Sequence, residues 1–319
     1  MTRYVVRRVL LALLVVLLVT VVTFILLHAL PGGPARGVLG VKATARQIAA
    51  FNQAEGFNQA LPVQYWDYLV RLLHGDLGTS YSMNADVSTL LGERLPKTLL
   101  LTATSTLLAI LVALPLGMWQ AARRGRAVDH LATGVSFVLY ATPVFFFSLL
   151  LIIVFAQAIP LFPAQAAQGD DVGTLLSQPG ALVLPVIAGA GATLAAFSRY
   201  MRSSAVDNLT EDYVRTARAK GTPERTILWR HVWPNSLTSI VALLGYYVPT
   251  VFGGSLVVES MFNYPGIGLL FWSAASNADF PVLLGVVLVI AVTTVVGSLL
   301  ADLAQLLIDP RVRIPGGAR

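Results

Sequence analysis

The sequence of 319 residues contains no cysteine, and only 12% of its residues are charged. Without cysteine the chain can form neither a disulfide nor a thiolate metal site, and it has no cysteine nucleophile. Soluble domains carry about 25% charged residues, whereas this chain has about half that share and is 56% hydrophobic. The composition therefore excludes an ordinary soluble globular domain and indicates a membrane protein.

The sequence also lacks the motifs that mark common enzyme and cofactor sites. It contains no Gly-x4-Gly-Lys-Ser/Thr phosphate loop, no zinc-protease helix motif and no nucleophile elbow. Its histidines form no ligand pair at helical spacing, so we expect them at helix ends or packed interfaces; they are His28, His74, His130 and His231. We therefore predict a non-enzymatic chain with no catalytic residue, no metal site and no cofactor of its own.

The sequence does contain six long apolar stretches that are candidates for membrane-spanning helices. They cover residues 9–27, 98–118, 131–158, 182–197, 237–258 and 282–307. Sixteen of the 22 Lys and Arg residues fall at the two termini and in the two loops that this assignment places on the same side. The other six lie in the long first loop, where the positive-inside bias is weak. This distribution predicts an all-α, multi-pass membrane protein with both termini in the cytoplasm, and it accounts for the net charge of +6 without nucleic acid.

The same assignment divides the chain into three parts. Residues 1–33 hold the basic N-terminal segment and the first span, residues 34–97 form a polar loop, and residues 98–319 hold the other five spans with a cytoplasmic loop at 203–235. The polar loop is too short for a large core of its own, so we predict a small extracytoplasmic helical insertion. Its aromatic residues Tyr65, Trp66 and Tyr68 fit either an interfacial belt or a surface that docks a partner.

Several spans contain residues that bend a helix or let helices pack closely. The sequence Tyr140-Ala-Thr-Pro143 predicts a kink that frees backbone carbonyls, and Gly189 and Gly191 predict close packing. The breaks of the fifth span fit either a gating bend beside a transport pathway or simple packing. The candidate pathway residues are Tyr140, Pro143, Tyr246, Tyr247, Pro249 and Gly253. Asp302 is the only charged residue inside a predicted span, and we interpret it as a helix-end partner of an arginine rather than as an ion-coupling site.

The longest charged segment of the chain, residues 211–235, follows the fourth span and reads as two short helices. Gly221 suits the left-handed position that ends the first helix. Thr222 and Pro223 suit the cap and first position of the second helix, and Pro234 is expected to end it.

Charge spacing supports the first of these helices, because Arg215 can pair with Glu211 or with Asp212 one turn away. So structured a loop between two spans predicts a surface that docks a partner. The alternative is an amphipathic loop that lies on lipid headgroups.

The charged segment also carries a family resemblance. Arg215-Thr-Ala217-Arg-Ala-Lys-Gly221, with Pro234 thirteen residues after the glycine, resembles the cytoplasmic coupling loop of ABC-importer membrane subunits. That family has Glu-Ala-Ala, three residues and Gly, and Arg-Thr-Ala is usual in its peptide-transporter branch. Further motifs follow in the same order: Leu30-Pro-Gly-Gly-Pro34, Gly75-Asp-Leu-Gly-Thr-Ser80, Tyr264-Pro-Gly-Ile-Gly268 and Asp309-Pro-Arg311. Over essentially its whole length the chain resembles the permease subunit of dipeptide and oligopeptide importers that has a long outer loop after its first span.

This resemblance implies a type I ABC importer permease fold in a bacterial-type cytoplasmic membrane. It implies that the chain and a second homologous permease form a pathway for peptides. Two ATP-binding subunits, which bind ATP and Mg, and an extracytoplasmic substrate-binding protein would complete the transporter. The residues implied to contact the ATPase, with Ala217 and Gly221 closest, are Asp212, Tyr213, Arg215, Thr216, Ala217, Arg218, Gly221 and Pro234. Those implied to dock the binding protein are Tyr264, Pro265 and Gly266.

Other classes of function stay open at this point. A secondary transporter or channel without an ATPase would usually carry buried acids in its spans, and only Asp302 qualifies. An intramembrane enzyme would need a Ser/Lys, His-rich or paired-Asp constellation, which the predicted spans lack. Within the family, nickel chelates, glutathione or haem are alternative cargoes, because the binding protein largely selects the substrate.

Overall fold

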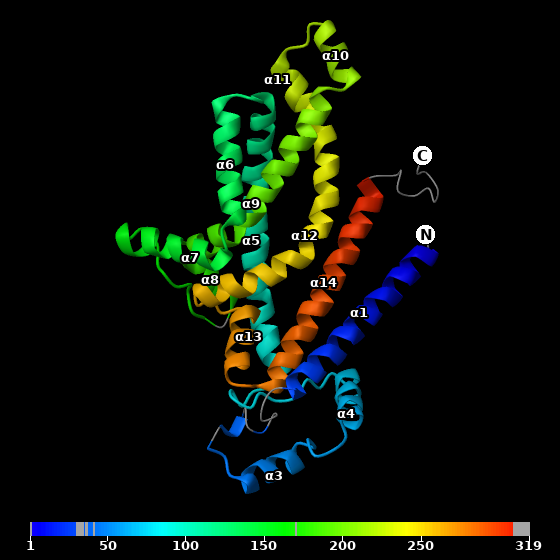
Figure 1. Cartoon of the computed structure of the whole chain (residues 1–319), viewed down its shortest axis with the longest axis vertical. Coiled ribbons are helices and arrows are strands. Elements are labelled where there is room, and N and C mark those ends of the chain that lie inside the picture. Colours follow the sequence, from blue (N-terminus) through cyan, green and yellow to red (C-terminus); the bar gives the residue numbers. More distant parts are fainter. Residues whose placement is uncertain (1, 30–34, 36–37, 41, 170, 309–319) are drawn as a thin grey trace. The chain divides into compact units, whose positions relative to one another are not determined.

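The computed structural model describes residues 2–29, 35, 38–40, 42–169 and 171–308, with only the backbone described for residues 2–5, 239, 242, 244–254 and 301–308. Within these ranges the chain forms helices and no strand (Figure 1), which confirms the all-α fold. The chain divides into two compact units. The first comprises Met1–Thr98, Gly169–Val172 and Pro265–Val296, and the second comprises Leu99–Gln168, Gly173–Tyr264 and Gly297–Arg319.

The first unit combines α1 (Thr2–His28), α3 (Ala45–Ala54), α4 (Leu61–Leu73), the start of α5 (Val87–Ala122), α13 (Ile267–Ser276) and most of α14 (Phe280–Ile308). Helices α3 and α4 lie within the predicted insertion, which is therefore helical as expected. Hydrogen bonds of 3.0 Å join Thr20 of α1 to Tyr65 of α4 and His28 of α1 to Gln64 of α4. These bonds fix α4 beside the C-terminal end of α1.

Helix α5 begins at Val87, eleven residues before the predicted start of the second span. The prediction gave too much weight to the polar and proline signals of Glu93-Arg94-Leu95-Pro96. Val87, Leu90 and Leu91 have the i, i+3, i+4 spacing of one helix face, and that face packs on α13 and α14 in the core of this unit. Burial of this apolar face outweighs the local signals.

A buried carboxylate fastens the loop before α5 to the turn between α13 and α14. Asp279 is 1% exposed. It accepts hydrogen bonds from the Ser80 hydroxyl at 2.6 Å, the Ser82 hydroxyl at 2.7 Å, and the Tyr81 and Ser82 backbone N–H groups at 3.3 and 3.1 Å. Asp279 thus holds residues 80–82 in place.

Replacing Asp279 by asparagine is expected to loosen this loop. The amide group would set an N–H donor against donors that now bind a carboxylate oxygen, with a cost of about 1–3 kcal/mol. Hydrogen exchange measured by mass spectrometry should become faster at residues 80–84. Asp76→Asn serves as the control, because exposed Asp76 accepts only the local Gly78 N–H at 2.8 Å. Equal exchange in the two variants would contradict the assignment.

The second unit is arranged around the long helix α9 (Gly180–Leu209), which packs against α6, α7 and α12. Its other elements are the rest of α5, α6 (Ala127–Ala141), α7 (Val144–Ile152), the π-helical turn η1 (Ile153–Ala158), α8 (Val172–Ser177), α10 (Asp212–Ala219), α11 (Glu224–Thr226), the π-helical turn η2 (Ile227–Val232) and α12 (Trp233–Met261). A Cβ on Gly189 would lie 2.7 Å from the Ser105 hydroxyl, and one on Gly191 would lie 2.8 Å from the Phe147 ring. Both glycines allow close packing, as predicted.

The predicted kink in the third apolar stretch is a sharp turn. Ala127–Ala141 and Val144–Ala158 are bent by 105° at a short break that contains Thr142 and Pro143. The Thr142 hydroxyl donates to the Val138 carbonyl at 2.7 Å, and α7 starts directly after Pro143. This prediction is confirmed.

A buried ion pair joins α6 to α9. Asp129 is 2% exposed, and the Arg202 guanidinium donates to its two oxygens at 2.6 and 2.8 Å. The Gly125 backbone N–H adds a third bond at 3.0 Å. Asp129 lies in the first turn of α6, two residues before the predicted start of the third span. The Asp302 side chain lies outside the described residues.

In the part of the chain that the structure describes, four helices are long and apolar enough to cross a membrane, and the number rises to five if the bent pair α6–α7 is one span. The boundaries differ from the predicted ones, since α9 runs to Leu209 rather than to residue 197. Helix α12 is one continuous helix from Trp233 to Met261. The α12 ribbon bends in Figure 1, but the helix is not broken, although Gly245, Pro249, Gly253 and Gly254 lie within it.

Candidate functional site

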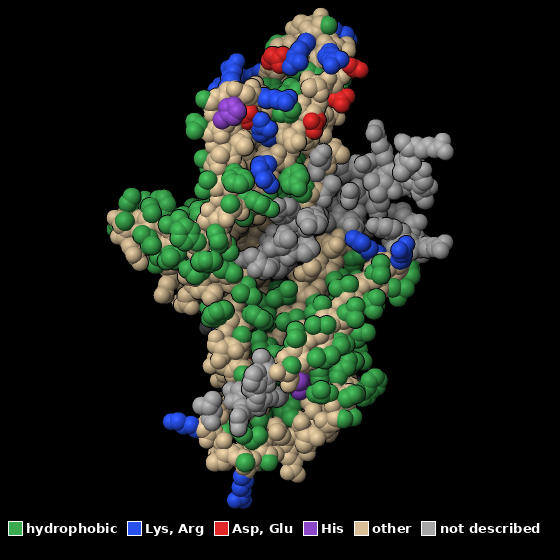
Figure 2. All heavy atoms as spheres, viewed as in Figure 1, with side chains coloured by type: hydrophobic (Ala, Val, Ile, Leu, Met, Phe, Trp, Pro, Cys, Tyr) green, Lys and Arg blue, Asp and Glu red, His purple; other side chains and the backbone are tan. Residues whose placement is uncertain are grey.

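The charged segment, residues 211–235, lies between α9 and α12 of the second unit and contains α10, α11 and η2. Figure 1 shows α10 and α11 as a small helix pair beyond the ends of α9 and α12. Charged side chains gather around this pair, whereas α7 presents a largely apolar surface (Figure 2). Because α9 ends at Leu209 and η2 leads directly into α12, the piece outside the long helices is shorter than the predicted loop 203–235.

The turn after α10 has the geometry that the sequence predicts. Gly221 has φ +77°, the left-handed conformation. Its N–H donates to the Arg218 carbonyl at 2.9 Å, and the Thr222 N–H donates to the Ala217 carbonyl at 3.1 Å. Together these bonds form a Schellman motif, which satisfies carbonyls that the end of a helix leaves without partners.

The second helix departs from the prediction at both ends. Pro223, not Thr222, is its N-cap, and Thr222 makes no side-chain cap hydrogen bond. Pro234 does not end the helix, because α11 continues through η2 into α12 and places Pro234 in the first turn of α12. Proline cannot donate a helical hydrogen bond, but Pro234 follows the π-helical turn η2 closely, and the Asn235 side chain donates to the His231 carbonyl at 2.7 Å. The charged segment is thereby continuous with α12.

Two ion pairs stabilise the helix pair. Arg215 bonds Asp212 at 3.2 Å, one of the two partners that its spacing allows. Arg218 bonds Glu224 at 2.6 and 3.3 Å across the Gly221 turn, and the hydrogen bond from Arg218 lowers the pKa of the Glu224 carboxyl below its ordinary value. The pair of Arg218 and Glu224 was not predicted, because its residues are six positions apart across a turn and not three or four apart on one helix.

One face of the charged segment is part of the core of its unit. Val214, Ile227 and Val232 are fully buried in a cluster with Phe197 and Met201 of α9. Burying an apolar side chain of this size contributes about 1.5–3 kcal/mol, so the helix pair has a fixed place on the unit. A loop that only rests on lipid headgroups has no need of such an anchor.

The opposite face is open to solvent and defines what a partner can touch. Arg215, Thr216 and Arg218 are exposed, and a Cβ on Gly221 would meet no atom within 4 Å. Ala217 is half-buried and packs on the core cluster of its own unit, so it is less accessible than the resemblance implies. The surface offers guanidinium groups around small and hydroxyl side chains, which suits an acidic groove on a partner.

The candidate pathway residues lie on two elements of the second unit. Tyr140 is half-exposed on α6, and the Arg199 guanidinium lies 4.6 Å from the centre of its ring. Pro143 forms the bend between α6 and α7. The side chains of Tyr246, Tyr247 and Pro249, together with Gly253, lie outside the described residues. Their place on α12 is fixed by the backbone alone.

The residues expected to dock a binding protein are not on the surface. Tyr264 is 0% exposed and belongs to a core cluster with Phe262 and Leu175. Pro265 and Gly266 are buried too. The expectation is wrong for these side chains, because the burial of the tyrosine ring outweighs the exposure that a proline–glycine loop usually indicates.

Comparison with known proteins decides the family. Residues 113–314 match the family of binding-protein-dependent transport system inner membrane components, and residues 1–102 match its N-terminal region. The chain belongs to this family.

Relatives of the same length support this assignment. The chain is 36% identical over 314 residues to the oligopeptide transport system permease protein AppB of Bacillus subtilis, with 98% of this chain and 99% of AppB covered. It is 35% identical over 318 residues to the glutathione transport system permease protein GsiC of Salmonella typhimurium, with coverage of 98% and 99%. GsiC of Escherichia coli is 32% identical over 313 residues, again with 98% and 99% covered. The chain is thus a multi-pass membrane permease component.

This membrane permease component has a polar surface that the sequence analysis missed. Gln64, Asp67, Tyr68 and Arg71 have the i, i+3, i+4, i+7 spacing of one face of α4, and all four line the same cavity. The sequence predicts an interfacial belt or a docking surface for the aromatic residues of this helix. The helical spacing of the polar residues was the available signal.

Proposed function

We propose that this chain is a non-catalytic permease subunit of an ATP-driven peptide importer and forms half of the translocation pathway. One observation carries the proposal: relatives named as oligopeptide and glutathione permeases align with 98% of the chain. Glutathione is a tripeptide, so both names point to short peptides as cargo. The name of the family itself supports a substrate-binding protein as a partner.

The proposal includes further partners of this chain and its place in the cell. A second homologous permease supplies the other half of the pathway, and two ATP-binding subunits bind ATP and Mg. The chain would lie in a bacterial-type cytoplasmic membrane with six spans and both termini in the cytoplasm. Helix α12, whose described backbone runs continuously over 29 residues, is long enough to be the sixth span.

In this proposal the ATPase docks on the exposed face of the charged segment. Arg215, Thr216, Arg218 and Gly221 supply the contact, while Asp212, Tyr213, Ala217 and Pro234 shape and anchor it. A docked partner changes the membrane helices only if its contact differs between its two ATPase states. The continuity of α11, η2 and α12 supports this role, since a shift of the charged segment moves the start of α12.

The proposal is tested with the chain produced together with a second permease, the ATP-binding subunits and the binding protein. We expect the permeases and ATPases to purify together from mild detergent. In proteoliposomes they should take up trialanine only when ATP and the binding protein are both present. Uptake by this chain alone, without ATP, would establish the rival secondary transporter.

Replacing Thr216 by tryptophan is expected to separate the ATPase from an intact permease. Thr216 is exposed on α10, so the larger side chain meets no neighbour of its own unit but obstructs a partner. Loss of one central contact costs about 2 kcal/mol or more, which predicts a fall of roughly thirtyfold in ATPase affinity and a similar fall in uptake. Arg124→Trp, at an exposed position in the turn after α5, is the matched control and should retain both activities. Normal ATPase binding by Thr216→Trp would refute docking at this face.

A further inference from the structure

The first unit contains a cavity of about 960 Å³ that none of the functions above uses. Its walls come from α1, α3, α4, the loop before α5 and the start of α14. Phe24, Phe51, Phe57 and Phe280 supply aromatic surface. A volume of this size suits a ligand of drug-like or short-peptide dimensions.

Helix α4 turns a polar face to this cavity. Gln64 is already engaged: its amide group donates to the Phe57 carbonyl at 3.2 Å and to the Gln59 carbonyl at 2.8 Å. Its carboxamide oxygen lies 3.0 Å from His28 Nε2. Gln64 therefore shapes the wall, whereas the residues one and two turns further along α4 have donors to offer.

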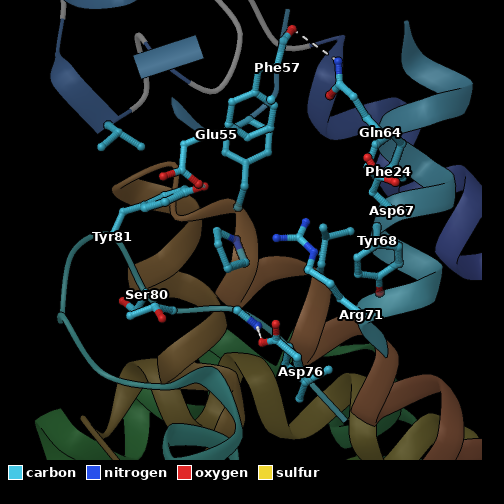
Figure 3. A pocket seen from close by; sticks show the side chains of 18 of the residues that line it. Phe24, Glu55, Phe57, Gln64, Asp67, Tyr68, Arg71, Asp76, Ser80 and Tyr81 are labelled. Atoms are coloured by element: carbon cyan, nitrogen blue, oxygen red, sulfur yellow. Dashed lines mark hydrogen bonds between the residues drawn. The ribbon is translucent and has the colours of Figure 1, made fainter. Parts of the chain in front are cut away.

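Two of these donors have no acceptor. The Tyr68 hydroxyl is buried and has no hydrogen-bond partner among the described residues, and Tyr68 as a whole is 7% exposed. Burial raises the pKa of Tyr68 to about 12, so its hydroxyl keeps the proton that it can donate. Arg71 makes no hydrogen bond or ion pair with any residue that the structure describes. Figure 3 shows the Arg71 guanidinium pointing into the middle of the cavity.

The opposite wall carries an acidic group. The Glu55 carboxylate accepts a hydrogen bond from the Tyr81 hydroxyl at 3.1 Å, and both residues face Arg71 across the cavity in Figure 3. Asp67 also lines the cavity, on the polar face of α4. The cavity therefore has a guanidinium, a hydroxyl donor and the Asp67 carboxylate on the α4 side, the Glu55 carboxylate on the other side and aromatic rings around them.

We propose that this cavity binds a short zwitterionic peptide, with the peptide carboxylate at Arg71 and Tyr68 and the peptide ammonium group at Glu55. A guanidinium can bind a carboxylate with two parallel hydrogen bonds, and these charge-assisted bonds are among the strongest in proteins. The phenylalanine rings accept peptide side chains without selecting among them. The proposal rests on the peptide-import function and adds a peptide subsite on the permease itself.

The experiment compares trialanine with trialanine amide, which differs only at the C-terminal group. Binding to the assembled permeases and ATPases in nanodiscs, without the binding protein, is measured by saturation-transfer NMR. We expect the acid to bind at least about tenfold more tightly than the amide, because the amide cannot form the paired bonds to Arg71. Arg71→Gln should abolish this difference and leave amide binding unchanged. Tyr68→Phe should reduce the difference by a smaller factor.

The control is Arg46→Gln, at an exposed position of α3 that does not line the cavity, and it should keep the full preference for the acid. Equal affinity of the wild type for acid and amide, or a preference that survives Arg71→Gln, would overturn the proposal. So would a preference that arises only after the binding protein is added, because that protein and not the cavity would then select the acid. ATP-driven uptake of trialanine by the same wild-type complex, placed in proteoliposomes together with the binding protein, shows separately whether the import function stands.

Discussion

Replacing Arg202 by methionine is expected to lower the free energy of unfolding of the second unit by about 3–5 kcal/mol. The substitution keeps most of the aliphatic stem of the side chain but removes the guanidinium that bonds both oxygens of Asp129 at 2.6 and 2.8 Å. Asp129 is 2% exposed, so its charge would stay buried with only the Gly125 N–H as a partner. A buried charge that loses its partner costs far more than a surface pair.

Thermal unfolding followed by tryptophan fluorescence measures this effect, and the apparent melting temperature should fall by roughly 10 °C. Asp129→Asn should cost less, because Arg202 is 30% exposed and its charge can still reach water. The double variant should be more stable than Arg202→Met alone. If the two single variants were equally unstable and their effects were additive, the ion pair would not be coupled as its geometry requires.

The second large effect is expected from Gly117→Ala, at the closest approach of α5 and α9. A Cβ at this position would lie 2.5 Å from the Ser198 carbonyl oxygen, 2.8 Å from Met201 Cβ and 3.0 Å from the Arg202 nitrogen. Two of these three atoms are backbone, so the helices must separate to admit one methyl group. We expect a loss of about 3 kcal/mol, the upper part of the usual range for overpacking.

Gly134→Ala on α6 is the matched control, since its Cβ would meet no atom within 4 Å. Alanine has the higher helix propensity, so this variant should be neutral or more stable by up to about 1 kcal/mol. Yield of monodisperse protein and apparent melting temperature distinguish the two variants. Equal behaviour would mean that α5 and α9 are less tightly packed at Gly117 than the distances require.

Local backbone chemistry explains which parts of the fold are predictable from sequence. Gly221 ends α10 because glycine enters the left-handed region without steric cost, and Pro143 favours the bend between α6 and α7 because proline lacks the N–H of a helical hydrogen bond and its ring crowds the preceding turn. Both signals need only neighbouring residues. Pro234 carries the same local signal, yet η2 and the Asn235 side chain accommodate it within continuous helix.

Packing between segments that lie far apart in the sequence explains the parts of the fold that the sequence does not predict. The sequence gives no reason to pair Asp129 with Arg202, 73 residues away, and α5 starts early because Val87 and Leu91 find partners on α13 and α14. The features of the candidate site also divide into those that local sequence predicts and those that depend on packing between distant segments. The charged segment is recognisable from its local pattern, but the inward position of Ala217 and the burial of Tyr264 depend on cores that assemble from remote residues.

The 105° turn at Pro143 has a consequence for the thickness of the insulating layer around this protein. Helix α6 has 15 residues and is about 22 Å long, less than the hydrocarbon layer of about 30 Å. Helix α6 alone is therefore too short to cross that layer. The first N–H groups of α7 have no helical acceptor, and Pro143 offers no side-chain cap. Lipid chains cannot accept these hydrogen bonds, so a bend inside that layer requires water or a polar group beside it, and the dielectric barrier would then be thinner there than in the surrounding bilayer.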